Sequence, residues 1–175
     1  MGLAGVAPRY QAPPGPPHAL TLRPVTPQDL ALTYAITRDA MRGYVEQTWG
    51  AWDEGDQRRK HRDSFTPQTH RIIEMESVPG PSQAAGLVAA EPWPDDPRCV
   101  WLVKLYLRAG FRGRGFGSQV LGDLVQQAAA ARRPLRLRVL RVNTRAQALY
   151  LRHGFSVFEE TAERLFMERK PGGVT

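Results

Sequence analysis

The segment FRGRGFGSQVL (111–121) carries glycines at alternate positions, Gly113, Gly115 and Gly117, with an arginine on each side of the first. Glycine lets a chain turn tightly and approach a ligand closely, because no Cβ stands in the way. Backbone N–H groups at the start of a helix are free to bind an anion, and the helix dipole favours negative charge there. The segment is therefore a candidate phosphate-binding loop; the alternative is a flexible glycine turn.

Three kinds of phosphate-binding loop can be compared with this spacing. A P-loop requires Lys-Ser or Lys-Thr after its last glycine, and no such pair occurs in the chain. A dinucleotide fingerprint requires wider glycine spacing and an acid about 20 residues on, but residues 132–142 contain no Asp or Glu. A pyrophosphate cradle of the form [QR]-x-x-G-x-[GA] is matched by Arg112, Gly115 and Gly117. The loop therefore favours a ligand that carries a pyrophosphate.

A second motif lies one helix and one strand further on. The segment VNTRAQALYLRHGF (142–155) resembles N-x-x-A-x-x-[FL]-Y-x-x-x-G-F of the GNAT superfamily of acetyl-CoA-dependent N-acetyltransferases. The matching residues are Asn143, Ala146, Leu149, Tyr150, Gly154 and Phe155. The glycine loop and the strand before it are similar to the same family's L-x-V-x-P-x-x-R-G-x-G-x-G, with Leu107 for Val and Ala109 for Pro.

This resemblance implies a fold and a cofactor over about residues 20–170. The expected fold class is α/β (α+β), with a mixed, mostly antiparallel central sheet flanked by helices and a splayed strand pair at the cofactor site. The expected cofactor is acetyl-CoA, and no metal is expected. The cofactor-binding residues that the resemblance implies are Leu105, Tyr106, Leu107, Arg112, Gly113, Arg114, Gly115, Phe116, Gly117, Ser118, Asn143, Ala146 and Tyr150.

Acetyl transfer to an amine requires a proton acceptor for the amine and a proton donor for the leaving thiolate. The resemblance assigns the donor role to Tyr150, whose hydroxyl, with an ordinary pKa of about 10, holds its proton at neutral pH. Helical spacing alone favours a core position for Tyr150. Asn143 could equally cap the helix that follows it, and Arg114 and Arg152 could be solvated surface charges.

The acceptor side is less well defined by the sequence. Many members of the family place a glutamate on the strand before the loop, but VWLVKLYL (100–107) has Lys104 and no carboxylate. Glu46 is the preferred candidate for the general base, and Glu74, Glu76, Glu91 or a water chain are alternatives. Aromatic faces attract cations, so the candidate acceptor-binding residues are Tyr44, Glu46, Trp49 and Trp52. The aromatic residues could instead anchor a helix junction.

These segments need elements to position them. We expect strands at 20–26, 70–78, 84–93, 99–107 and 135–142, and a final strand pair in FSVFEET and RLFMERK, with an antiparallel meander through 70–107. We expect helices from Pro27, over 53–65, over 118–131 and over 144–154. Residues 41–52 are predicted to be a connection, because they contain two glycines.

Length and composition indicate a single domain over 19–171, with tails at 1–18 and 172–175. The 175 residues include one cysteine, Cys99, which we expect to be buried and inert, and no apolar run of about 18 residues. No signal peptide is apparent, so a cytoplasmic location and no membrane partner are expected.

The net charge is +7, and 21 of the 24 basic residues are arginines. Such a charge raises the hypothesis of a nucleic-acid partner. The arginines are spread along the chain with no dense basic tract, so we expect none.

The sequence therefore predicts an N-acetyltransferase that moves an acetyl group from acetyl-CoA to a primary amine of a small molecule or a protein, by direct transfer in a ternary complex. The alternatives are an acyl-CoA sensor of the same fold and a basic nucleic-acid-binding protein. A homodimer is possible in either case.

Overall fold

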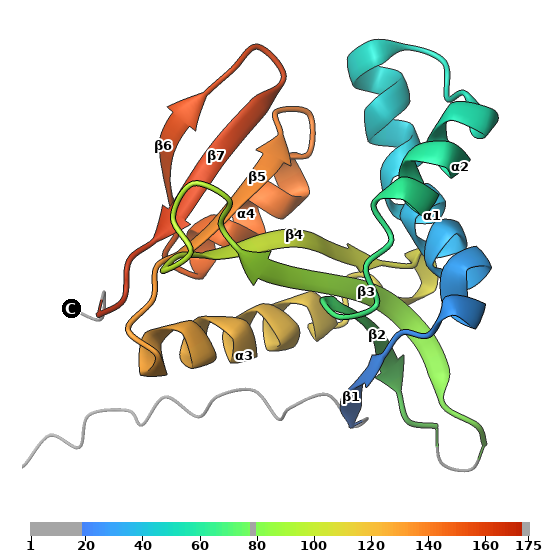
Figure 1. Cartoon of the computed structure of the whole chain (residues 1–175), viewed down its shortest axis with the longest axis horizontal. Helices are drawn as coiled ribbons and strands as arrows, with labels where there is room; N and C mark the ends of the chain where they lie inside the picture. Colours follow the sequence, from blue (N-terminus) through green and yellow to red (C-terminus); the bar gives the residue numbers. More distant parts are fainter. Residues whose placement is uncertain (1–18, 78–79, 173–175) are drawn as a thin grey trace, which may run out of the picture.

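A seven-stranded sheet in the order β1-β2-β3-β4-β5-β7-β6 forms the centre of the computed structural model, which describes residues 19–77 and 80–172 (Figure 1). The strands are Leu20–Pro24 (β1), His70–Met75 (β2), Gln83–Pro92 (β3), Val100–Leu107 (β4), Leu135–Leu140 (β5), Ser156–Glu160 (β6) and Arg164–Arg169 (β7). All neighbouring strands are antiparallel except β4 and β5. The expected meander and the mixed, mostly antiparallel sheet are confirmed. The tail at 1–18 and residues 173–175 lie outside the described residues.

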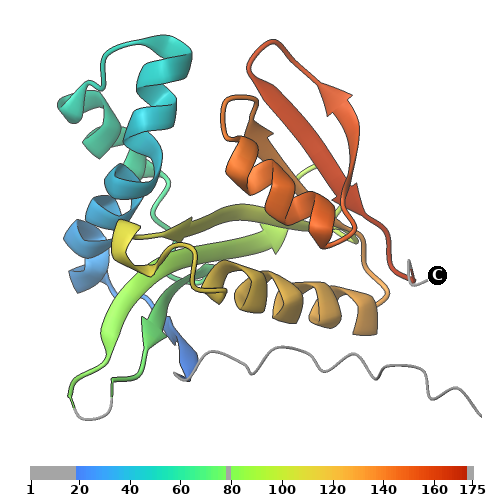
Figure 2. The same cartoon turned by 180° about the vertical axis from the view of Figure 1, so that it is seen from behind.

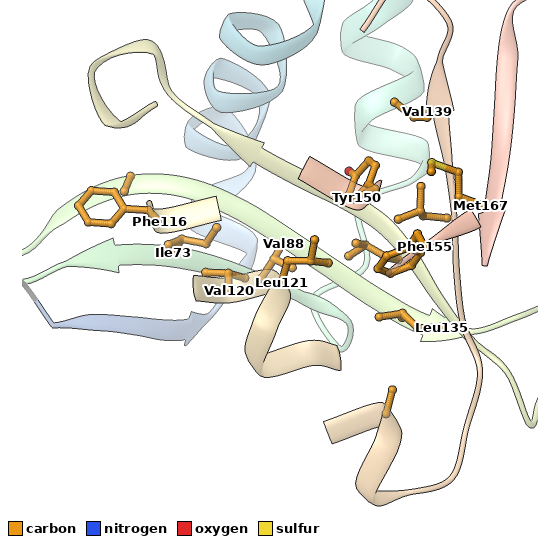
Figure 3. Packing of buried hydrophobic residues seen from close by; sticks show 14 of the residues in the cluster. Ile73, Val88, Phe116, Val120, Leu121, Leu135, Val139, Tyr150, Phe155 and Met167 are labelled. Carbon is orange, nitrogen blue, oxygen red and sulfur yellow. The ribbon is translucent and has the colours of Figure 1, made fainter. Parts of the chain in front are cut away.

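Helices cover both faces of the sheet (Figures 1 and 2). They are α1 (Leu30–Trp49), α2 (Glu54–Asp63), α3 (Phe116–Ala130) and α4 (Thr144–Arg152), with short 3₁₀ turns at Pro27–Asp29 and Ala109–Phe111. The larger core packs α3 and α4 against one face and includes Phe116 and Leu121 of α3, Leu137 of β5 and Met167 of β7. Figure 3 shows Phe116 at one end of this cluster and Met167 at the other. The smaller core packs Ile36 of α1 against Ile72 and Leu87 on the other face. Neither face alone could bury this much apolar surface, so the two layers stabilise the sheet together.

The first helix is longer than the sequence predicts. We expected a connection over 41–52, but α1 continues to Trp49 and ends at Gly50, whose φ is +93°. Gly43 sits in the helix interior, where a glycine costs about 1 kcal/mol relative to alanine, but the helix continues through it. Ala40, Met41 and Tyr44 lie at helical spacing and share one face, while Arg42 forms an ion pair with Glu46 one turn on.

Strands β4 and β5 pair only at their beginnings. Val100, Trp101 and Leu102 pair with Leu135, Arg136 and Leu137, and beyond these positions the two strands separate. The edge of β4 that faces β5 therefore has no strand partner from Val103 onwards. This is the splayed pair that the fold class predicts.

Strand β4 approaches β3 so closely at Gly86 that only a glycine fits there. A Cβ on Gly86 would come within 2.1 Å of the carbonyl oxygen of Tyr106 and 2.9 Å of the Leu107 side chain. We expect Gly86→Ala to lower the free energy of unfolding by about 3 kcal/mol, because a backbone atom cannot move aside cheaply. Gly43→Ala is the matched control: no atom lies within 4 Å of its Cβ, so it should leave stability unchanged or raise it. Equal thermal midpoints for Gly86→Ala and the wild type would contradict the packing of β3 on β4.

Two buried histidines predict acid sensitivity. His61 and His70 are 5% and 3% exposed, and burial lowers the pKa of each from 6.5 to about 4. The unfolded chain takes up these protons near pH 6.5 and the folded chain only near pH 4. The unfolded state thus binds more protons between these values, and the free energy of unfolding falls as pH is lowered through them, by roughly 3 kcal/mol per histidine.

Denaturant unfolding at pH 7, 5.5 and 4.5 measures this slope. His70→Asn keeps a donor near the carbonyl oxygen of Thr66, which lies 2.9 Å from Nδ1 of His70, but it cannot titrate. We expect the free energy of unfolding of the variant to depend on pH about half as steeply as that of the wild type, whatever its stability at pH 7. An unchanged slope would show that the acid sensitivity arises elsewhere.

Candidate functional site

A cleft of about 260 Å³ lies at the splay, between α1, the glycine loop and α4. It is lined by eleven of the predicted cofactor- and acceptor-binding residues: Tyr44, Leu105, Tyr106, Leu107, Arg112, Gly113, Gly115, Gly117, Ser118, Asn143 and Ala146. It is also lined by Ala40, Met41, Arg145, Leu149 and Arg152. The structure thus brings two sequence motifs, about 30 residues apart, to one concave site.

The glycine loop presents a row of free donors to this cleft. Gly113 and Gly115 have φ of +74° and +84°, a left-handed conformation that glycine adopts without strain. Gly115 is the N-cap of α3, and the N–H groups from Gly113 to Ser118 have no acceptor among the described residues. No atom lies within 4 Å of a Cβ built on Gly115. Free N–H groups at a helix start, with open space in front of them, make an anion-binding cradle.

Arg112 holds the loop in place as well as lining the cleft. Its Nε donates to the carbonyl oxygen of Leu107 at 2.8 Å and its Nη2 to that of Asp39 at 2.9 Å. The carboxylate of Asp39 in turn accepts from the N–H of Ala109 at 2.7 Å. These contacts fasten the loop to β4 and α1, so the residue that the motif assigns to pyrophosphate also fixes the shape of its site.

Three predicted cofactor residues do not line the cleft: Arg114, Phe116 and Tyr150. Arg114 turns back over the ring of Phe116, with its guanidinium carbon 5.0 Å from the ring centre. Phe116 is 1% exposed and belongs to the larger core.

Two arginines of the neighbouring helix line the cleft, whereas Arg114 does not. Arg145 and Arg152 of α4 both line the cleft, with Leu149 between them. Positions 145, 149 and 152 follow one face of a helix, so helical spacing from Ala146 could have identified them.

Asn143 and Ser118 secure the helices beside the cleft. The side chain of Asn143 caps α4 by accepting from the N–H of Ala146 at 3.0 Å. The hydroxyl of Ser118 lies 2.7 Å from Nε2 of His153, at the end of α4. The start of α3 is therefore held to the end of α4, beside the cleft.

Tyr150 belongs to the larger core and does not line the cleft. Its ring is 8% exposed and packs 5.8 Å from that of Phe155 within the larger core (Figure 3). Burial, and then the neighbouring Tyr106, raise the pKa of Tyr150 well above its ordinary value. Burial also raises the pKa of Tyr106, to about 12. Both hydroxyls hold their protons throughout the neutral range.

Of the four predicted acceptor residues, only Tyr44 lines the cleft. Glu46 points to an ion pair with Arg42, with 2.8 Å between Oε1 and Nε. Trp52 donates from Nε1 to Glu54 at 3.0 Å. Trp49 is 50% exposed, and the guanidinium carbon of Arg164 in β7 lies 5.1 Å from its ring centre.

The other candidate bases do not line the cleft either. Glu74 is bound to Arg23 at the β1–β2 edge, and Glu76 follows the end of β2. Glu91 is on β3, paired with Trp101. Cys99 is buried, and burial raises the pKa of its thiol, which fits an inert core cysteine.

Lys104 occupies an unusual position in the middle of the sheet. Ala89 of β3 pairs with both His70 and Lys104, and over this small residue Nζ of Lys104 comes within 3.2 Å of Nε2 of His70. Burial lowers the pKa of Lys104 to about 8.

The sequence profile of the Acetyltransferase (GNAT) family matches residues 34–155, most of the chain and the whole of the cleft. The chain belongs to the GNAT family of acetyltransferases. The expectation drawn from the two motifs is confirmed, and so is acetyl-CoA as the cofactor that the family uses. No curated protein shows significant similarity to the chain.

Solved GNAT structures share the fold. PaiA N-acetyltransferase from Thermoplasma acidophilum, in complex with coenzyme A, is 16% identical with a TM-score of 0.65, and the match covers 87% of this chain and 99% of that one. An acetyltransferase from Thermus thermophilus is 22% identical with a TM-score of 0.64, over 86% and 96% of the two chains. At these identities the likeness concerns the fold alone. None of the helices in residues 19–77 and 80–172 is long and apolar enough to cross a membrane.

Proposed function

We propose that this GNAT protein is an N-acetyltransferase that moves the acetyl group of acetyl-CoA to a primary amine by direct transfer. The observation that carries the proposal is the row of free N–H groups from Gly113 to Ser118, which opens into a cleft continuous with the splay of β4 and β5. These N–H groups suit a pyrophosphate. The unpaired edge of β4 offers backbone N–H and C=O groups to the amides of the pantetheine arm of coenzyme A. Arg145 and Arg152 add positive charge beside them.

When bound, acetyl-CoA supplies an acetyl thioester, whose carbonyl carbon the amine attacks and whose sulfur departs. Tyr150 holds the proton that the departing sulfur needs, because burial keeps its hydroxyl protonated. The N–H groups on the free edge of β4 can stabilise charge on the carbonyl oxygen. Glu46 remains our proposal for the base, and it must leave Arg42 to act. Tyr44 provides an aromatic wall for the amine.

The test is release of free thiol from acetyl-CoA with a panel of primary amines, together with detection of the acetylated product by mass spectrometry. We expect product that depends on both acetyl-CoA and the amine. Tight acetyl-CoA binding without product from any amine would favour the alternative, an acyl-CoA sensor of the same fold.

A further inference from the structure

Three arginines of strands β5 and β7 lie on one face of the sheet. Arg136 pairs across β5 and β7 with Glu168, Arg138 with Phe166, and Arg164 with Leu140. Paired residues, and residues two apart along a strand, share a face. Arg164 stacks on Trp49 of α1, which identifies this face as the one that carries α1.

Only one of these arginines is neutralised. Arg136 forms an ion pair with Glu168, with 2.7 Å between Nη2 and Oε1. Arg138 and Arg164 have apolar residues opposite them, and neither forms a salt bridge or a side-chain hydrogen bond with any residue of 19–77 or 80–172. Their guanidinium carbons lie instead over tryptophan rings, at 6.0 Å from Trp101 and 5.1 Å from Trp49. Two like charges therefore act on each other without an ion-pair partner among the described residues.

Arg138 lies at the splay and Arg164 lies on β7 beyond it, and neither arginine lines the cleft itself. Arg138 is the first residue of β5 beyond the last pair with β4, Leu102 with Leu137. Its charge acts on Tyr106, which lines the cleft from the opposite strand, and opposes the rise in the pKa of that hydroxyl. Arg164 reaches Trp49, on the same helix as Tyr44 of the cleft wall. Figures 1 and 2 show α1 and the β5–β7–β6 part of the sheet rising on the same side of β4.

We infer that the acceptor is an amine that also carries a carboxylate, an amino-acid-like molecule, and that Arg138 and Arg164 bind this carboxylate. The inference rests on the proposed function. A guanidinium fork matches a carboxylate with two parallel hydrogen bonds, and Trp49 and Trp101 hold the forks in place. A polycationic acceptor meets repulsion from both arginines and from Lys104, whereas an anion removes the repulsion between the arginines.

The experiment compares amino acids with their carboxamides, which differ only in the negative charge. The panel is the proteinogenic amino acids and the matching amino acid amides, each assayed for thiol release from acetyl-CoA. A second readout needs no turnover: the thermal midpoint of the protein saturated with CoA, measured with N-acetyl amino acids and with their amides. We expect the acids to be preferred by at least about tenfold in kcat/KM, and to raise the midpoint where the amides do not.

Three variants assign the preference to these residues. Arg138→Gln and Arg164→Gln should each reduce it about tenfold, mainly through KM, and leave the midpoint rise with acetyl-CoA intact. Arg138→Lys keeps the charge and should restore part of the preference. Arg62→Gln, an exposed arginine of α2 without a side-chain partner among the described residues, is the matched control and should change nothing.

The outcomes separate this inference from the proposed function. Equal use of acids and amides, or preference for amides or polyamines, overturns the carboxylate site while the acetyltransferase stands. Equal midpoints with N-acetyl amino acids and their amides overturn it even without turnover. Failure of acetyl-CoA to bind or to release thiol with any amine counts against the proposed function instead.

Discussion

Replacing Tyr150 by Phe is expected to lower kcat by about 10²- to 10³-fold while leaving the affinity for acetyl-CoA unchanged. The substitution removes only the hydroxyl, a group near the splay that is both buried and held protonated. The ring still fills its place against Phe155, so the fold is retained. Steady-state kinetics with a saturating amine, together with a binding titration of acetyl-CoA, measure the two quantities separately.

Tyr34→Phe is the control for this variant. Tyr34 is 5% exposed, but it lies on α1 against His61 and outside the cleft. Loss of its hydroxyl should leave kcat unchanged. Full turnover in Tyr150→Phe would remove Tyr150 from the reaction, and an equal loss in both variants would show that the effect is structural.

The second large effect is expected at Gly115. Its φ of +84° is tolerated by asparagine and aspartate better than by other residues, and a side chain there enters the open space before the N–H groups of α3. Gly115→Asp places a negative charge where a pyrophosphate would sit. We expect it to weaken acetyl-CoA binding by at least 100-fold, or about 3 kcal/mol, through repulsion and occupation of the cradle.

Gly115→Asn is the matched control, because it has the same size and backbone tolerance without the charge. It should weaken binding by roughly tenfold less than the aspartate variant. The difference should shrink at high salt, since the N-terminus of α3 is exposed to screening. Equal affinities of the two variants at low salt would mean that no phosphate is bound at this loop.

The cleft could be predicted from sequence where its geometry is local. The loop from Gly113 to Ser118 is set by glycines, and the cap at Asn143 by its own side chain, so short motifs carry the conformation with them. The fold was predicted through the family resemblance, because it depends on strand pairings between segments that are far apart in the sequence.

Predictions failed where distant residues decide the outcome. Gly43 favours a break in α1, but the helix runs through it to Trp49 and contributes Met41 and Tyr44 to the cleft. Arg114 is drawn to Phe116, although its place in the motif suggested a phosphate contact.

The contact of Trp49 with Arg164 joins residues more than 100 positions apart, and nothing in either segment signals it. The pair of Glu46 with Arg42 is different, because its spacing of four residues on a helix is visible once the helix is assigned. The prediction of the acceptor-binding residues thus rested on a connection over 41–52, where the structure has the end of α1.

The most direct test of the account is a thermal-unfolding titration with acetyl-CoA, with NAD as comparator. A ligand that binds only the folded chain must raise the midpoint, by an amount that corresponds to about 2.7 kcal/mol at 100 times its Kd. The account predicts a dose-dependent rise with acetyl-CoA and none with NAD. No rise at millimolar acetyl-CoA would contradict it, because the N–H groups from Gly113 to Ser118 would then hold no pyrophosphate.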